Sequence, residues 1–272
     1  MAASHWTLDD IPWQQFDRTR VDPELVKIIK AASLVEYNGG IYADYLCNVF
    51  PDDTAFQAAA KIWAQEEVQH GEALARWAAM ADQAFDFDAS IQRFRDGYQI
   101  PVDAPESVRG SRSGELVARC IVEVGTSSYY ASIASLTDEP VLKAICRNIA
   151  ADELRHYKLF YTHLKRYLEH ERIGKWRRLA VALGRIGESE DDELAYAFYA
   201  ANENEQPYDR KKHGQAYMKR AYACYRLSHV QRAVSMTFKA AGLSPQNPIT
   251  GPLSRLLFGF MRLRSRWTPA AA

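Results

Sequence analysis

A four-residue motif, Glu-x-x-His, occurs twice in this chain and constrains its fold more than any other feature. The copies are Glu67 to His70 and Glu153 to His156, each inside a long run of helix formers that only Gly71 interrupts in the first copy. Residues three apart lie one turn apart on the same face of a helix, so the Glu and His of each copy can reach one metal ion. The motifs therefore predict two long helices that each carry a ligand pair.

Two further acids complete an internal repeat. Glu36 precedes the first motif and Glu123 precedes the second by almost the same interval. The chain thus contains, twice over, a helix with a Glu followed by a helix with Glu-x-x-His. A four-helix bundle with these ligands is typical of di-iron and di-manganese carboxylate proteins, so the repeat predicts an all-α bundle.

Capping and breaking residues give the expected bounds of these elements. Asp22 followed by Pro23 predicts a helix start. The four bundle helices are expected over 23–49, 54–81, 113–136 and 141–170. Residues 1–22 are expected to form an N-terminal arm, and 85–112 a connection with a short helix over 89–94. Residues 171–272 are expected to form a helical extension packed on the 23–170 core, with helices over 191–201 and 208–241.

The phase of the motifs indicates that the ligands face inward. In both motif helices the Glu and His continue a stripe of large apolar residues at steps of three and four. Four buried carboxylates would cost several kcal/mol each unless protons or cations neutralised them. Two divalent ions would balance the four acids, and oxygen-rich ligands with one imidazole per ion and no thiolate favour iron or manganese. The predicted ligands are Glu36, Glu67, His70, Glu123, Glu153 and His156. A lone Glu-x-x-His would be read as a chance pattern on a solvated helix face, whereas the inward-facing repeat favours a dimetal site.

Composition excludes several other classes of protein. Lysine plus arginine equals aspartate plus glutamate at 34 each, so bulk charge does not indicate nucleic-acid binding. The four cysteines form no Cys-x-x-Cys pair, which indicates reduced thiols in a cytoplasmic protein and no iron–sulfur or zinc-ribbon site. No signal peptide and no apolar run of membrane-spanning length is found, so a soluble protein is expected.

Small residues accompany the acids of the other two bundle helices. Ser33, Gly40 and Ala43 share the predicted face of Glu36, and Cys120 and Thr126 share that of Glu123. Two interpretations stay open: close helix approach, or an apolar channel that presents a substrate to the metals. In the second case Thr126, one turn after Glu123, would direct its hydroxyl toward the oxygen-binding position.

The motif helices resemble a known family. The stretches 63–71 (WAQEEVQHG) and 149–156 (IAADELRH) are similar to the two metal-binding helices of the soluble acyl-acyl-carrier-protein desaturases, which belong to the ferritin-like superfamily. Glu123 followed by Thr126 resembles that family's third ligand helix and its oxygen-pocket threonine. Trp6 with Asp10 resembles a region implicated there in electron delivery. The resemblance covers roughly residues 1–170.

The resemblance implies a role for each matched residue. Glu36 and Glu123 would be terminal or bridging carboxylates of a di-iron site, Glu67 and Glu153 would be the other carboxylates, and each iron would have one histidine. Outside the ligands, Asp152 would orient a ligand histidine, with Glu66 as its symmetric counterpart. Thr126 would be catalytic and Trp6 part of an electron path.

The implied activity is oxygen-dependent oxidation of an unactivated C–H bond in an acyl substrate bound to acyl carrier protein. Because no cofactor-binding domain is found, electrons would come from a separate ferredoxin or flavoprotein, and a homodimer is expected. The same ligand pattern serves hydroxylases, N-oxygenases and cyclases, so desaturation and hydroxylation both stay open. A ferritin-like or rubrerythrin-like protein that handles iron or scavenges peroxide is the alternative, and a metal-stabilised structural protein is a third reading.

The last hundred residues carry weaker signals. A basic cluster of Arg172, Lys175, Arg177 and Arg178 is either a solvated face or a docking patch for an acidic carrier protein. Tyr217, Tyr222 and Tyr225 are interpreted as core or interface groups. The tail over 256–267 mixes apolar residues with arginines, which indicates packing on the bundle or a second subunit, or alternatively peripheral contact with an anionic membrane.

Overall fold

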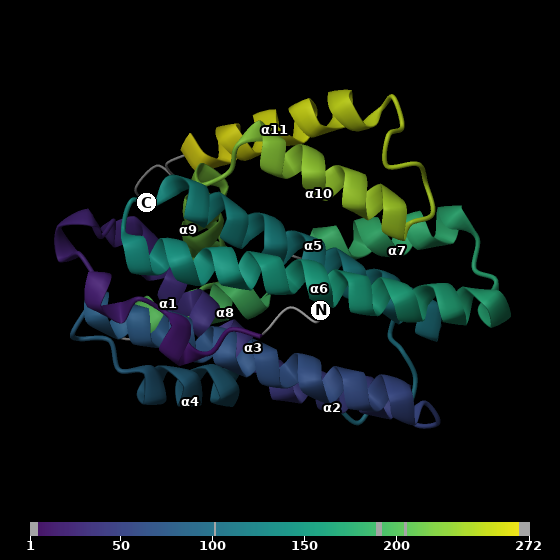
Figure 1. The fold of residues 1–272 in the computed structure, drawn as a ribbon, viewed down its shortest axis with the longest axis horizontal. Helices are drawn as coiled ribbons and strands as arrows, with labels where there is room; N and C mark the ends of the chain where they lie inside the picture. Colours follow the sequence, from purple (N-terminus) through teal and green to yellow (C-terminus); the bar gives the residue numbers. More distant parts are fainter. Residues whose placement is uncertain (1–4, 101, 189–191, 204–205, 267–272) are drawn as a thin grey trace.

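The computed structural model describes residues 5–100, 102–188, 192–203 and 206–266, which form α-helices and short 3-10 turns (Figure 1). None of these residues lies in a strand, so the all-α prediction is confirmed. No described helix is both long enough and apolar enough to cross a membrane.

Four long helices form the centre of the molecule. α1 packs against α3, α5 packs against α6, and α3 faces α6 across the middle. In Figure 1 the α1–α3 pair lies below the α5–α6 pair. Their bounds are α1 Pro23–Tyr37, α3 Thr54–Ala81, α5 Arg112–Leu136 and α6 Pro140–Glu171.

The starts of these helices follow from local chemistry. The side chains of Asp22, Asp53 and Ser111 each accept a hydrogen bond from a backbone N–H in the first turn of the helix that follows. Glu139 does the same for α6, with Pro140 as the first helical residue. Because these signals are local, the predicted bounds of α3, α5 and α6 agree with the structure to within one residue at each end.

The prediction of one continuous helix over 23–49 is wrong. The chain turns at Asn38, and α2, Gly39–Val49, begins there. The break accompanies very close packing on α3: a Cβ at Gly39 would lie 2.5 Å from the Glu67 Cβ, and one at Gly71 would lie 2.5 Å from the Tyr37 nitrogen. Asn38 favours a turn and the glycine behind it permits this approach, which brings the end of α1 against the first motif.

The described part of the N-terminal segment contains three 3-10 turns and contacts the bundle. The turns are Leu8–Asp10, Trp13–Gln15 and Arg18–Arg20. Trp13 is buried, with the Arg76 guanidinium 4.1 Å from its ring centre, and the Asp17 N–H donates to Glu139.

The short helix expected in the connection is longer than predicted and forms α4, Phe87–Gly97.

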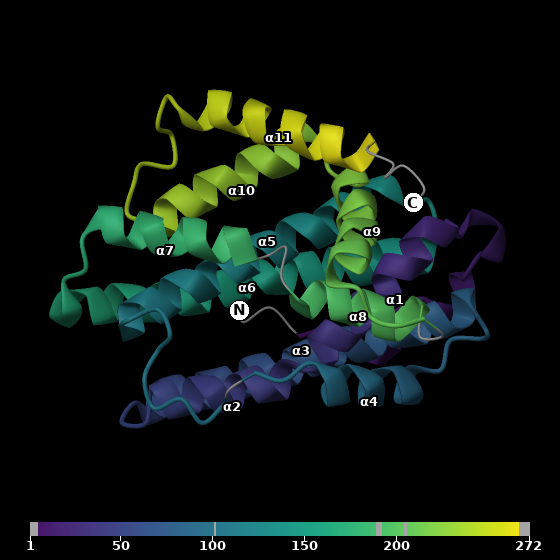
Figure 2. The same cartoon turned by 180° about the vertical axis from the view of Figure 1, so that it is seen from behind.

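Five further helices cover one side of the bundle (Figures 1 and 2). α8 packs on α1, α7 and α10 pack on α5, and α11 packs on α9 and α10. Their bounds are α7 Lys175–Glu188, α8 Asp192–Asn202, α9 Arg210–Ala223, α10 Leu227–Ala240 and α11 Thr250–Arg266.

Three features of this region differ from the sequence prediction. The helix expected over 208–241 breaks at Arg226, whose backbone is extended while its guanidinium donates to the Ser135 carbonyl, a contact between distant parts of the chain. α7 was not predicted. The tail over 256–267, for which no helix was predicted, belongs to α11, which begins at Thr250. Residue 267 of that tail lies outside the described residues, as does residue 191 at the start of the helix expected over 191–201.

Candidate metal centre

The six predicted ligands come together in the middle of the bundle, and all six are buried. α1 supplies Glu36, α3 supplies Glu67 and His70, α5 supplies Glu123, and α6 supplies Glu153 and His156. They form two groups, in each of which one ligand atom per residue lies within 4.8 Å of the others. The groups are Glu36, Glu67, His70 and Glu153, and Glu67, Glu123, Glu153 and His156. Glu67 and Glu153 belong to both.

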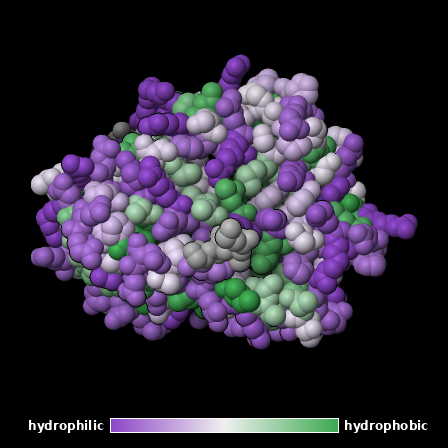
Figure 3. All heavy atoms as spheres, in the orientation of Figure 1, coloured by the Kyte–Doolittle hydropathy of each residue, from purple (hydrophilic) through white to green (hydrophobic). Residues whose placement is uncertain are grey.

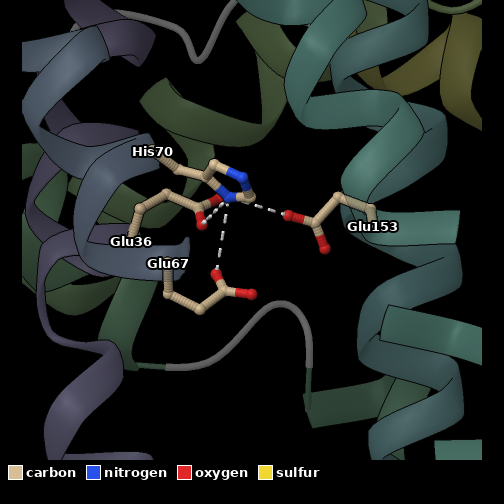
Figure 4. A group of neighbouring side chains, drawn as sticks. All are labelled: Glu36, Glu67, His70 and Glu153. Atoms are coloured by element: carbon tan, nitrogen blue, oxygen red, sulfur yellow. Dashed lines mark ion pairs between the residues drawn. The ribbon is translucent and has the colours of Figure 1, made fainter. Parts of the chain in front are cut away.

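In the first group the Nδ1 atom of His70 faces three carboxylates (Figure 4). It lies 3.3 Å from Glu153 Oε1, 3.7 Å from Glu36 Oε2 and 3.9 Å from Glu67 Oε2. Figure 4 shows Glu153 reaching toward the ring from the opposite side of the site. One imidazole nitrogen and three carboxylate oxygens therefore surround a common point.

The second group repeats this geometry around His156. Its Nδ1 atom lies 3.1 Å from Glu67 Oε1, 3.5 Å from Glu123 Oε2 and 3.8 Å from Glu153 Oε2. The two imidazole rings are 5.8 Å apart, centre to centre. The centre thus has two adjoining halves with the same composition.

The inner atoms of both groups have no hydrogen-bond partner. These atoms are Glu67 Oε1, His70 Nδ1, both Glu123 oxygens, Glu153 Oε1 and His156 Nδ1. A buried polar atom left unpaired typically costs about 1–3 kcal/mol, so a cluster of them is unusual unless another group binds there. Two cations fit this donor set, and its many oxygens, few nitrogens and lack of thiolate suit iron or manganese.

Without ions, the electrostatics of the centre favour bound protons. Burial, followed by the charge of Glu153, raises the pKa of Glu123 to about 8, and burial raises the pKa of Glu67 well above its usual range. Burial alone would lower the pKa values of His70 and His156, but the surrounding acids raise both. Burial also acts to raise the pKa of Glu153, yet the two histidines outweigh it and lower that pKa. Divalent ions would therefore replace protons on binding.

The outer nitrogen of each histidine lies close to the acid that immediately precedes the other motif. His70 Nε2 lies 3.1 Å from Asp152 Oδ2, and His156 Nε2 lies 2.6 Å from Glu66 Oε2. Arg155 joins the two acids by donating to Asp152 at 2.5 Å and to Glu66 at 3.2 Å. These contacts orient both rings so that Nδ1 faces the centre.

Trp6 lies directly behind His70. Its indole N–H donates to Asp152 Oδ2 at 2.7 Å, and its ring stacks on the imidazole with centres 5.9 Å apart and planes 2° apart. The side-chain amide of Gln69 donates a hydrogen bond to the Trp6 carbonyl oxygen at 3.0 Å. Asp10, expected to act with Trp6, instead accepts hydrogen bonds from Thr7 within the arm.

Thr126 contacts the centre through a shared carboxylate. Its hydroxyl donates to Glu153 Oε2 at 2.7 Å and also reaches the Val122 and Glu123 carbonyls of its own helix. The hydroxyl therefore points toward a carboxylate of the candidate centre.

The small residues beside Glu36 were given two interpretations. The close contacts of Gly39 and Gly71 support close helix approach in this part of the bundle. A cavity of about 980 Å³ lies elsewhere, at the end of the bundle where α2 and α6 finish, and Val49, Arg112, Arg166 and Tyr167 are among its lining residues. The apolar channel stays a prediction.

Four contacts of the centre were not foreseen. Tyr130 donates to Glu36 Oε1 at 2.5 Å, His5 lies 2.8 Å from Glu66, and Arg155 bridges the outer acids. Glu193 of α8 lies near Glu36, and burial followed by the charge of Glu36 raises its pKa to about 8. Tyr130 shares the inward face of Glu123 and could have been found by phase, whereas Glu193 comes from a distant helix without any motif.

Comparison with known proteins adds one match. A model of the fatty acid desaturase family matches residues 47–180, a segment that holds α3, α5, α6 and every candidate ligand except Glu36. Over these residues the chain belongs to the fatty acid desaturase family. A search of curated proteins finds no match.

Membership of this desaturase family implies a di-iron, oxygen-dependent oxidoreductase on a ferritin-like bundle, with acyl-acyl-carrier-protein as substrate. The buried carboxylate and histidine centre fits that chemistry. The resemblance, the fold class and the enzyme class read from the motifs are therefore confirmed. Among the alternatives, the family match favours a desaturase over a protein that stores iron or scavenges peroxide.

Proposed function

We propose that this desaturase oxidises an acyl chain carried on acyl carrier protein, at a di-iron centre made by the six ligands. The observation that carries the proposal is the pair of ligand groups with unpartnered inner atoms and two shared carboxylates. Glu67 and Glu153, which belong to both groups, would help to hold both ions, and Glu36 and Glu123 would each help to hold one. The family supports iron, while manganese is a second ion that the same donor set accepts.

Bound iron would supply the oxygen binding and electron transfer needed to oxidise a C–H bond. The residues around the six ligands orient the ligand side chains by hydrogen bonds. Asp152 and Glu66 accept from the outer nitrogens of the histidines, which leaves each Nδ1 lone pair free to face an ion. Tyr130 donates a hydrogen bond to Oε1 of Glu36 and so orients that carboxylate.

Thr126 is proposed to hold a proton at the centre. Its hydroxyl is within hydrogen-bond distance of Glu153, so it can orient that carboxylate or pass a proton to it. This contact supports the role that the resemblance implied.

Electrons are proposed to enter through Trp6 from a separate ferredoxin or flavoprotein. The continuous contacts from Trp6 to Asp152 and to the His70 ring support this path. Arg172, Lys175 and Arg177 are exposed and remain available for an acidic carrier protein. A homodimer and a cytoplasmic location remain predictions.

The test is a single-turnover assay with product analysis. The protein is loaded anaerobically with ferrous iron, reduced, mixed with a long-chain acyl carrier protein and exposed to oxygen. Mass spectrometry of the released acid should show loss of two hydrogens for desaturation, or gain of one oxygen for hydroxylation. Glu153→Ala should give neither product. Oxygen uptake with accumulating ferric iron and unchanged lipid would contradict the proposal and favour iron handling.

A further inference from the structure

α11 has one face that packs on the bundle. Leu253, Phe258 and Met261 lie against a small core formed by Val230, Val234 and Phe238 of α10. The packing that the tail sequence predicted is thus made by this inner face, which fixes the helix on the body.

The opposite face of α11 carries a second apolar stripe. Leu256, Phe260 and Leu263 are 71%, 48% and 68% exposed, and Ile249, just before the helix, is 58% exposed. Their spacings of seven, four and three place them along one side of the helix. Figure 3 shows hydrophobic atoms among hydrophilic ones at the upper edge of the molecule, over α11.

Arginines flank this stripe without acidic partners. Arg255, Arg262 and Arg266 are exposed and, at steps of seven and four, follow a line beside the apolar residues. α11 contains no acidic residue, and no described acid forms an ion pair with any of these three arginines. The outer face is therefore apolar along one line and positively charged along the next.

We propose that the outer face of α11 binds the surface of a membrane that contains anionic lipid. A helix with apolar side chains on one line and arginines beside it lies flat in the lipid interface, where the apolar groups enter the acyl boundary and the cations meet the head groups. The helix of 17 residues is roughly 25 Å long, enough for such a contact without spanning the bilayer.

Charge favours this occupant over a second copy of the chain. A two-fold contact through α11 would place the arginines of one copy against those of the other, with no acid on either helix to separate them. The apolar side chains also protrude, and a fluid lipid interface receives protruding groups without a matching pocket. The proposal does not rest on the proposed oxidase activity.

The test is flotation of the full chain with vesicles of phosphatidylcholine alone, or mixed in equal parts with phosphatidylglycerol. The wild-type protein should float only with the mixed vesicles. Leu256→Ser combined with Phe260→Ser and Leu263→Ser should abolish flotation. Neutralising Arg255, Arg262 and Arg266 to glutamine should weaken partitioning about five-fold per arginine, or roughly a hundred-fold together.

A matched control removes exposed apolar groups elsewhere. Ile62→Ser, Val108→Ser and Leu136→Ser replace side chains that are 56%, 66% and 46% exposed, and this variant should float as the wild type does. Circular dichroism verifies that all variants remain helical. Equal flotation of the α11 apolar variant and the wild type, or no flotation of the wild type, would overturn the proposal. So would a wild-type dimer that the same variant converts to a monomer, because the stripe would then be a subunit interface.

Discussion

Glu153 belongs to both ligand groups, so replacing it with alanine should remove metal from the whole centre. The variant leaves three carboxylates for two divalent ions and removes one ligand from each. Removing one partner from a buried set of charges typically costs about 3–5 kcal/mol, which corresponds to a loss of roughly two to four orders of magnitude in affinity. We expect the wild-type chain to bind two irons and Glu153→Ala to retain almost none.

Glu123→Ala provides the internal comparison. Glu123 belongs only to the second group, so the first group keeps all four of its ligands and should still bind one ion. Glu115→Gln is the matched control, because Glu115 is also buried on α5 but is bonded to Tyr45, Ser107 and Arg119 outside the centre. This control should bind two irons, which separates loss of a ligand from loss of stability.

The assay is metal content after anaerobic loading and desalting, together with thermal unfolding. At a free ion concentration a hundred times Kd, binding stabilises the folded chain by about 2.7 kcal/mol per site, which raises Tm by roughly 5–10 °C in a protein of this size. Glu153→Ala should lose this increase. Two irons retained by Glu153→Ala would refute the shared-ligand geometry.

Three other changes have defined outcomes. Asp152→Asn should weaken metal binding about 10- to 100-fold in chelator competition without abolishing it, because the contact orients a ligand rather than supplying one. Gly71→Ala should lower stability by about 1–3 kcal/mol in denaturant titration, since its Cβ would lie 2.5 Å from the Tyr37 nitrogen. Gly125→Ala should not, because its Cβ would meet no atom within 4 Å beyond its own helix backbone and chain neighbours. The Tm of the metal-free protein should decrease as the pH rises from about 5 to about 8. In this range the folded chain still holds the proton of Glu123, whose pKa is about 8, whereas the unfolded chain has released it near pH 4.5. Metal-loaded protein should lack this slope, and an equal slope in both forms would contradict the assignment.

Local patterns in the sequence indicated the six residues that the structure brings together in the candidate centre. The ligands lie on helices whose apolar stripes have a clear period and whose first turns have capping side chains. Those signals depend on neighbours in the chain, so they set both the helix bounds and the inward direction of each motif.

The features that sequence reasoning missed depend on contacts between distant segments. The chain breaks at Asn38 where two glycines let α1 and α2 approach α3, and a pattern within 23–49 does not show what lies opposite. Arg226 ends a helical run because of its contact with the end of α5. Glu193 reaches the neighbourhood of Glu36 from a helix far along the chain. At Asn38 and Arg226 tertiary packing overrides helix propensity, and at Glu193 it brings together residues that no local pattern connects.

The contacts of Gln69 and Arg155 make the two halves of the repeat unequal. These residues occupy the same position in the two motifs, yet Gln69 fastens the Trp6 segment whereas Arg155 ties the acids behind both histidines. The two halves of the centre, which have nearly the same ligands, therefore differ in their surroundings. The indole ring of Trp6 stacks on His70, whereas the arm residue on the His156 side, His5, contacts Glu66 instead of the ligand ring. An electron that enters through Trp6 would therefore reach the half of the centre that contains His70 first.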